Sequence, residues 1–371
     1  SQNSNALRLR AWTDRFRART LEQKKATTDM NETGKLYIHV KNNRWAPGSF
    51  PNTPEGEEVF TINEERFNTA IATFPNLADK VEAFFDWDED TFDTSMARAD
   101  VLLTWNLPTD GLAEKAKNLR WIHCIGAGVE HMLPLSWVPD GVELTNSKGV
   151  HSDKAGEYGL MAALMLHNWM PAIVTNQRKH IYNTLYSTPI AGKTLVVVGT
   201  GSLGGAAIRK LAPLGPNIIG VNRRGGDVEG CTRVVQTADL DSVLPEADIL
   251  YLAMPDTPET NGLINRDRLN SLKPTCGVVN IGRESAMDYD ALCDKLEAGE
   301  LAGAVLDVFT PEPIEEGSRL WDTPNLIITP HVSADDGDSY VPLTLDLFFR
   351  NLERFVAGQD LLNRVDRLLG Y

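Results

Sequence analysis

The chain has 371 residues, enough for about two domains of ordinary size. Its 29 glycines and 20 prolines are too few and too scattered for a collagen-like or low-complexity protein. With 36 basic against 51 acidic residues the formal net charge is −15, so we expect no nucleic-acid partner, because such binding depends on clustered Lys and Arg.

Residues 1–34 form a basic N-terminal extension of this sequence. Positions 1–25 hold seven Lys and Arg residues but only two acidic ones. We expect a surface extension on a cytoplasmic protein. An Arg-rich, acid-poor start is also typical of organelle targeting peptides, and that alternative stays open.

Short apolar runs alternate with helical stretches from Gly34 to Val150. Strands are predicted at 36–40, 101–104, 119–124 and 142–145, and helices at 64–74 and 112–116. This alternation is typical of βαβ units, which build a parallel sheet.

The most apolar stretch, at 158–173, follows this first half. It contains His167 and Asn168 and is shorter than the ~20 residues that a bilayer crossing needs. We therefore predict one buried helix over about 153–170, with His167 as an ordinary helix residue, and no membrane association.

The alternating pattern restarts after Gly192. Strands are predicted at 194–198, 217–221, 232–235, 248–253, 277–281, 303–306 and 326–329. Helices are predicted at 203–214, 238–244, 266–272, 289–297 and 339–355. The sequence thus predicts two similar α/β halves, each built around a parallel sheet.

Cysteine usage indicates neither a metal site nor a disulfide framework. The four cysteines lie far apart and form no CxxC pair; they are Cys124, Cys231, Cys276 and Cys293. Reduced thiols of this kind are typical of a cytosolic protein.

A glycine-rich loop follows the apolar strand at 194–198 and opens a helix. Its three glycines fit a dinucleotide-binding turn: Gly199 permits the turn, Gly201 lets a pyrophosphate approach, and Gly204 lets helix and strand pack closely. The start of the helix attracts phosphate with its backbone N–H groups. We expect cofactor contacts from these glycines and from Ser202 and Leu203.

The end of the next strand predicts which dinucleotide is bound. An NAD site places an acidic residue there, but this chain has Asn222, Arg223 and Arg224, and the first acid is Asp227. Two guanidiniums suit the 2′-phosphate that distinguishes NADP(H) from NAD(H). The sequence therefore favours NADP(H) as the cofactor. The alternatives are that the site binds NAD(H), or that the two arginines are only solvated charges on the surface.

Three segments near the ends of later strands carry reactive side chains. They are Asn280–Arg283, Leu306–Pro313 and Thr329–Ala334. Ligands of an open parallel sheet bind outside the carboxyl ends of its strands, so we expect all three segments to face one crevice.

With these motifs the sequence, from about Leu36 to its end, resembles the D-isomer-specific 2-hydroxyacid dehydrogenases. Three further segments carry the resemblance: the loop Gly126-Ala-Gly128, the segment that begins with Gly149-Val-His and ends with Gly-Glu157, and residues 324–331. Residues 222–224 look like those of the glyoxylate/hydroxypyruvate reductase branch.

The resemblance implies two Rossmann-like parallel-sheet domains, one of them flavodoxin-like, with an intervening cleft. Residues 35–150, completed by 336–371, would form the substrate domain, and 151–335 the dinucleotide-binding domain. A homodimer is implied as well, and the apolar helix at 153–170 would suit its interface.

The resemblance also implies the site residues. Arg283, Glu312 and His331 would form the catalytic set, and Ala127 and Gly128 would bind the substrate together with Arg283 and His331. Further cofactor contacts are expected at Asn222, Arg223, Arg224, Ala253, Met254, Pro255, Ile281, Gly282, Asp307 and Ala334.

The residue types suit reduction of a 2-keto acid. Arg283 can hold a carboxylate and a carbonyl, His331 can donate a proton to the carbonyl oxygen, and Glu312 can orient His331 and favour its protonated form. No metal is required.

The sequence departs from the family pattern at one position, and two other functions stay open. Glu284 stands where the family usually has Gly. A formate or phosphite dehydrogenase shares the implied fold, although Glu312 replaces the Gln of formate enzymes. A cofactor-sensing binding protein, similar to transcriptional corepressors of this family, is the alternative without catalysis.

Overall fold

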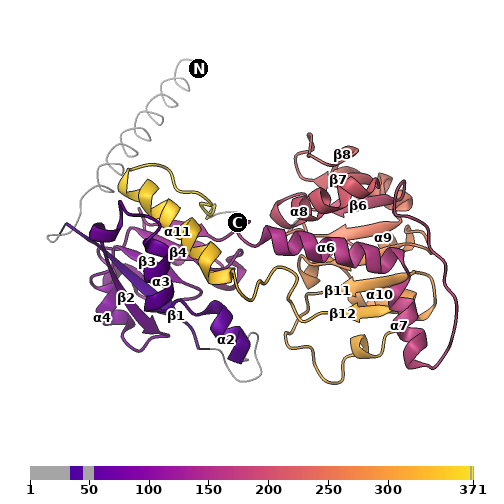
Figure 1. Ribbon diagram of the computed structural model, residues 1–371, viewed down its shortest axis with the longest axis horizontal. Coiled ribbons are helices and arrows are strands. Elements are labelled where there is room, and N and C mark those ends of the chain that lie inside the picture. The colour runs from indigo at the N-terminus through magenta and orange to yellow at the C-terminus, as the bar shows by residue number, and fades with distance from the viewer. Residues whose placement is uncertain (1–33, 45–53, 368–369, 371) are drawn as a thin grey trace, which may run out of the picture. The chain divides into compact units, whose positions relative to one another are not determined.

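The computed structural model describes residues 34–44, 54–367 and 370 (Figure 1). The described residues divide into two compact units. The first comprises residues 34–44 together with Glu57–Val150 and the described part of Asp338–Tyr371, and the second is essentially His151–Gly337. The predicted basic extension at 1–34 lies, except for Gly34, outside the described residues.

The first unit contains a five-stranded parallel sheet. Its strand order is β2-β1-β3-β4-β5, the order of flavodoxin-like folds. The strands are β1 (Leu36–Asn42), β2 (Val81–Trp87), β3 (Val101–Thr104), β4 (Trp121–Cys124) and β5 (Glu143–Asn146). The helices are α2 (Pro54–Phe60), α3 (Glu64–Ile71), α4 (Phe92–Met96), α5 (Leu112–Lys115) and α11 (Tyr340–Val356).

Aromatic side chains of α11 build one face of the core of this unit. Phe348 stacks on Trp121 of β4 with ring centroids 4.9 Å apart, and Phe349 meets Phe67 of α3 edge-on at 5.0 Å. Because such rings bury large apolar areas, the last helix completes the fold that residues 34–150 begin.

The second unit contains a seven-stranded parallel sheet of order β12-β11-β10-β9-β6-β7-β8 (Figure 1). Its strands are β6 (Thr194–Val198), β7 (Asn217–Asn222), β8 (Arg233–Gln236), β9 (Ile249–Leu252), β10 (Gly277–Asn280), β11 (Gly303–Leu306) and β12 (Leu326–Ile328). Its helices are α6 (Ser152–His167), α7 (Met170–Arg178), α8 (Ser202–Leu211), α9 (Arg266–Asn270) and α10 (Tyr289–Glu297). The strand order reverses between β6 and β9, which is the ligand-binding switch point of a Rossmann sheet.

The predicted α/β class with two parallel sheets is confirmed, but several elements differ. The helix predicted over about 153–170 is confirmed as α6, but its predicted end is wrong: α6 ends at His167, Trp169 has a left-handed φ of 60°, and α7 begins at Met170. The cause is Pro171, whose ring in a continuous helix would clash with the carbonyl of His167.

The helix predicted at 238–244 is also wrong. Two 3₁₀ turns, Thr237–Ser242 and Leu244–Glu246, occupy this segment. Pro245 lacks an N–H group and disfavours the α conformation at the residue before it, so a regular α-helix does not form. The sequence reading also missed β2 and the short helices α2, α4 and α7.

Candidate active site

The glycine loop of the second unit has the geometry of a phosphate cradle. Gly199 has a left-handed φ of 91°, and a Cβ built on Gly204 would lie 1.9 Å from the Gly199 carbonyl oxygen, so no larger residue fits there. A Cβ on Gly201 meets no other described atom within 4 Å. This open backbone at the start of α8, which Ser202 and Leu203 begin, fits a dinucleotide pyrophosphate.

Asn222, at the end of β7, organises the turn that follows it. Its Nδ2 donates to Thr200 Oγ1 (3.0 Å), and its Oδ1 accepts from the backbone N–H groups of Arg224 (3.0 Å) and Gly225 (2.7 Å). The side chains of Arg223 and Arg224 are exposed and directly follow β7, which pairs with β6, the strand that leads into the glycine loop. The amide of Asn222 thus links the phosphate cradle to the backbone of Arg224 and Gly225.

The remaining predicted cofactor residues follow neighbouring strands of the same sheet. Because β6, β9, β10 and β11 are adjacent and parallel, their carboxyl ends lie along one edge. Ala253, Met254 and Pro255 follow β9, Ile281 and Gly282 follow β10, Asp307 follows β11, and Ala334 lies in the segment after β12. Their cofactor contacts stay predictions.

The loop that carries Arg283 is held by the buried side chain of Asn280. Its Oδ1 accepts from Gly282 N–H (3.0 Å), and its Nδ2 donates to the Arg283 carbonyl (3.0 Å) and to Tyr289 Oη (3.1 Å). Tyr289 in turn donates to the Val308 carbonyl (2.8 Å). The backbone at Arg283 is therefore fixed to both β10 and the loop after β11.

Glu312 and His331 form a hydrogen-bonded pair. Glu312 Oε2 lies 2.7 Å from His331 Nδ1, and Oε1 accepts from the Phe309 N–H group (2.8 Å). His331 has a left-handed φ of 54°, a conformation that is uncommon for residues other than glycine. The structure thus joins two side chains that lie 19 positions apart in the sequence.

Asp307 holds the segment on which His331 sits. This fully buried carboxylate accepts hydrogen bonds from Thr329 Oγ1 (2.5 Å), Val332 N–H (3.0 Å) and Ser333 N–H (2.9 Å). The hydroxyl of Tyr158 on α6 lies 2.6 Å from Thr329 Oγ1. Sequence reasoning missed this network, which gives Asp307 protein partners in addition to the predicted cofactor contact.

Electrostatic interactions favour an imidazolium–carboxylate pair. Burial alone lowers the pKa of His331, but its hydrogen bond with Glu312 and the charges of Glu312 and Asp307 outweigh burial and raise that pKa. Burial acts against ionisation of Glu312, yet its bonds with His331 and Phe309 lower its pKa. The positive charge of Arg283 lowers the pKa of both His331 and Glu312, so the three predicted catalytic residues interact electrostatically.

Asp335 is a further acidic group of this site that sequence reasoning missed. Burial is the main reason that its pKa rises to about 6, and the charges of Asp307 and Glu312 add to the rise, whereas His331 opposes it. The position after Ala334 gave no signal in the sequence, because an aspartate near a strand end is most often a solvated surface group.

The predicted substrate loop lies in the first unit, directly after β4. Asn146 Nδ2 donates to the Ala127 carbonyl (2.9 Å), and Ser147 N–H donates to the Gly126 carbonyl (2.9 Å). Ala127 is exposed and Gly128 half-buried. The loop has a fixed backbone, and its binding of a substrate carboxylate stays a prediction.

Two further properties concern the described residues as a whole. Within 34–44, 54–367 and 370, no three His, Cys, Asp or Glu side chains gather as a metal site would require. No helix among these residues combines the length and the hydropathy needed to cross a membrane.

Known proteins resemble this chain in sequence and fold. The family model for the NAD-binding domain of D-isomer-specific 2-hydroxyacid dehydrogenases matches residues 160–333. A glyoxylate reductase of Thermofilum pendens is 31% identical over 66% of this chain and 74% of its own length. A D-3-phosphoglycerate dehydrogenase of Synechocystis is also 31% identical, but the match spans 64% of this chain and 43% of that relative.

A solved structure extends the similarity across both units. The NADPH-dependent glyoxylate/hydroxypyruvate reductase of Sinorhizobium meliloti, in complex with NADP and sulfate, has a TM-score of 0.72 and 28% identity. The comparison covers 91% of this chain and 100% of that one. The chain therefore belongs to the family of D-isomer-specific 2-hydroxyacid dehydrogenases, as its motifs predicted.

Proposed function

We propose that the protein is an NADP(H)-dependent reductase of 2-keto acids, equivalently a D-2-hydroxyacid dehydrogenase, of the glyoxylate/hydroxypyruvate reductase type. The observation that carries this proposal is the hydrogen-bonded pair of Glu312 and His331, whose side chains lie 2.7 Å apart. The charge of Arg283 acts on this pair, and all three residues lie in the unit that holds the glycine loop. The glyoxylate reductase relative and the NADP complex of the similar structure support the substrate class and the cofactor.

The cofactor would be held at the carboxyl edge of the second sheet. The loop from Gly199 to Gly204 would take the pyrophosphate, and the guanidiniums of Arg223 and Arg224 would take the 2′-phosphate. When bound, NADPH supplies the hydride that reduces the keto carbon.

The chain's own residues would bind the keto acid and deliver the proton. Arg283 presents a planar fork of donors, which suits the carboxylate and the adjacent carbonyl of the substrate. Because Glu312 engages Nδ1 of His331, Nε2 is the nitrogen that would donate a proton to the carbonyl oxygen. Glu312 keeps the ring protonated and oriented, so His331 acts as an acid in reduction and as a base in oxidation.

The pH dependence of reduction tests the Glu312–His331 pair. Since Glu312 raises the pKa of His331, wild-type protein keeps the imidazolium to higher pH and loses reductive rate only as pH rises through that raised value. Replacing Glu312→Gln should lower this pKa, so the alkaline limb of kcat should move to lower pH. Rate–pH profiles of the two proteins measure the displacement.

Glu315→Gln is the matched control for that profile, because Glu315 is an exposed carboxylate on the same loop. Its alkaline limb should coincide with that of the unmutated protein. An alkaline limb that stays in place in Glu312→Gln would show that Glu312 does not tune His331.

The stereochemistry of the product tests the proposed reaction. Reduction of hydroxypyruvate with NADPH should yield D-glycerate, an expectation that rests on family membership. Chiral chromatography of the product decides the matter, and formation of the L isomer would contradict the proposal.

The proposal also includes the assignment of the first unit to substrate binding, a cytoplasmic location and a homodimer. Exposed apolar side chains on adjoining helices support the dimer: Met161 of α6 is 44% exposed and Met170 of α7 is 36% exposed.

A further inference from the structure

Tyr158 lies on α6, outside the loops that carry the predicted site residues. Helix α6 lies on one face of the second sheet (Figure 1), and the ring of Tyr158 is buried in the apolar core that also contains Val279 of β10 and Val305 of β11. The hydroxyl oxygen of Tyr158 lies 2.6 Å from Thr329 Oγ1. The packed ring therefore holds this hydroxyl at a fixed place beside the segment after β12.

The hydrogen bonds of Tyr158 and Thr329 run in one direction. Thr329 Oγ1 donates to Asp307 Oδ1 (2.5 Å), and a hydroxyl has only one proton to give, so Tyr158 is the donor in its contact with Thr329. Burial is the main reason that the pKa of Tyr158 is raised; the charge of Asp307 adds to the rise and the bond with Thr329 opposes it. The tyrosine hydroxyl therefore keeps its proton. We call Tyr158, Thr329 and Asp307 the tether.

The tether ends on the carboxylate that holds both sides of the His331 turn. Before His331, Thr329 donates to Asp307 Oδ1. After it, Val332 N–H donates to the same oxygen (3.0 Å) and Ser333 N–H donates to Oδ2 (2.9 Å). The His331 N–H group donates to the Thr329 carbonyl (3.0 Å), which closes the turn. A shift of Thr329 would therefore move the backbone of His331.

The backbone of this turn needs such support. The left-handed φ of His331 is unfavourable for a residue with a Cβ, and conformations of this kind persist where surrounding contacts hold them. Pro330, between Thr329 and His331, has no N–H group to donate. The turn therefore depends on the bonds that the side chains of Thr329 and Asp307 provide.

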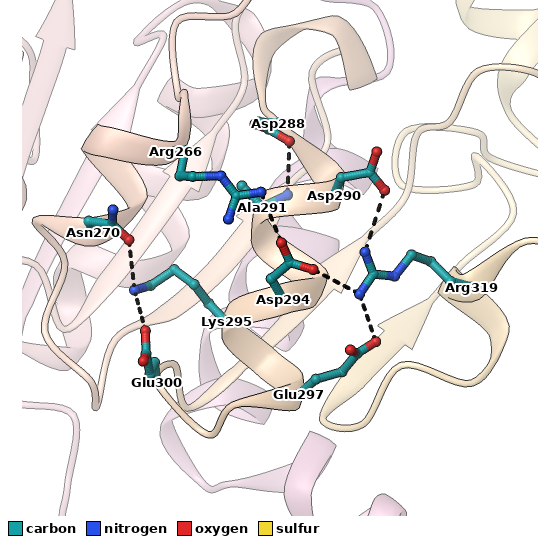
Figure 2. Close-up of polar contacts among 10 residues, drawn as sticks. All are labelled: Arg266, Asn270, Asp288, Asp290, Ala291, Asp294, Lys295, Glu297, Glu300 and Arg319. Carbon is teal, nitrogen blue, oxygen red and sulfur yellow. Dashed lines mark hydrogen bonds and ion pairs between the residues drawn. The ribbon is translucent and has the colours of Figure 1, made fainter.

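Burial distinguishes the tether from polar contacts elsewhere in the second unit. Arg266 lies 2.9 Å from Asp294 of α10, and Arg319 contacts the same carboxylate at 3.0 Å (Figure 2). The side chains of Arg266 and Asp294 are 51% and 46% exposed, so water can replace their contact at little cost. Tyr158 and Asp307 are buried, so loss of a bond in the tether leaves a group that water does not reach.

We propose that Tyr158 is a positioning residue: its hydroxyl holds Thr329 and, through Asp307, fixes the turn that carries His331. The inference rests on the proposed function. It goes beyond that function, since it assigns a part in catalysis to a side chain of α6 that belongs to none of the segments predicted to bind substrate or cofactor. Misplacement of a reacting group by about 1 Å can cost about 10²-fold in rate, so such a contact affects turnover from a distance.

Steady-state kinetics of single variants of the full chain, with NADPH and hydroxypyruvate, test the tether. Tyr158→Phe keeps the buried ring, removes the donor and should lower kcat by about fivefold. Thr329→Val removes both bonds of the threonine hydroxyl and should lower kcat by about tenfold or more. Thr329→Ser keeps the hydroxyl and should stay within about twofold of the unmutated kcat.

The split between kcat and KM separates positioning from a general loss of structure. KM for NADPH should change less than about twofold in all three variants, because the glycine loop and the arginines would hold its phosphates. An unchanged kcat in Tyr158→Phe would overturn the proposal. A Thr329→Ser protein as slow as Thr329→Val would overturn it too, since the hydroxyl would then have no part in the effect.

A double variant decides whether Tyr158 acts through Thr329. The protein with both Tyr158→Phe and Thr329→Val should be no slower than Thr329→Val alone, because the tyrosine then has no hydroxyl to hold. Losses that multiply would show two independent effects and contradict the proposal.

Two control variants remove groups that the tether does not include. Tyr251→Phe removes a buried hydroxyl that also faces α6: a Cβ on Gly159 would lie 2.6 Å from Tyr251 Oη, and this oxygen has no hydrogen-bond partner among the described residues. Arg266→Ala removes the exposed ion pair with Asp294. Both should keep kcat within about twofold of the wild-type value. A loss in Tyr251→Phe equal to that in Tyr158→Phe would show that any change in this core slows the reaction, and would overturn the role of the Tyr158 hydroxyl.

Hydrogen exchange provides a readout that needs no turnover. The amides of Val332 and Ser333, which donate to Asp307, should exchange at least about tenfold faster in Tyr158→Phe and in Thr329→Val, while amides of β6 keep their wild-type rates. Unchanged exchange at both amides would overturn the tether. If the unmutated protein reduces no keto acid, the proposed function fails, and this exchange experiment still decides whether Tyr158 holds the His331 turn.

Discussion

Replacing His331→Ala is expected to lower kcat for 2-keto acid reduction by 10²–10⁴-fold, the usual contribution of a general acid–base group. The affinity for NADPH should remain nearly unchanged, because the imidazole would act on the substrate carbonyl and the phosphates would contact the glycine loop and arginines. Steady-state rates and a fluorescence titration with NADPH measure the two quantities separately.

His167→Ala is the matched control for that experiment. His167 lies at the end of α6, where its Nε2 contacts the Thr188 carbonyl at 2.5 Å, and it belongs to no part of the proposed site. Its kcat should stay within about twofold of the unmutated value. A His331→Ala protein that retains most of its turnover would remove the proton donor from the proposed mechanism.

The double replacement Arg223→Ala and Arg224→Ala is expected to raise KM for NADPH by about tenfold or more per arginine. Charge-assisted hydrogen bonds contribute about 1.5–3 kcal/mol each, and both exposed guanidiniums follow the strand end where an NAD site would carry an acid. KM for NADH should change little, because NADH has no 2′-phosphate.

Arg233→Ala tests whether any loss of positive charge on this unit has the same effect. Arg233 is an exposed residue of β8 that pairs with Glu246, so its removal should leave both KM values unchanged. Equal affinity of the unmutated protein for NADPH and NADH would contradict the assignment of Arg223 and Arg224 to the 2′-phosphate.

Local signals made most of the second sheet predictable. The apolar run at 194–198, the glycines after it and the amphipathic stretch of α8 each point to the same strand–turn–helix unit, and the structure contains that unit. Pro171 is equally local, yet its effect on the apolar stretch was missed because the run of apolar residues continues past it.

Long-range contacts explain what the sequence did not show. Asp307 bonds to residues 22–26 positions further along the chain, and Glu312 bonds to His331, 19 positions away. No periodicity encodes such pairs, because they arise from the adjacency of β10, β11 and β12 in the folded sheet. The strand β2 was missed for a related reason: it is a half-buried edge strand without strict alternation of apolar and polar residues.

Initial rates of cofactor turnover test the central claim most directly. The unmutated protein would be supplied with NADPH or NADH and a panel of 2-keto acids that includes glyoxylate and hydroxypyruvate, with formate and phosphite tested against the oxidised cofactors. We predict NADPH oxidation with at least one keto acid, a much lower kcat/KM with NADH, and loss of the reaction in His331→Ala. Turnover with formate or phosphite alone, or cofactor binding without any turnover, would contradict the proposal that this protein is a 2-keto acid reductase.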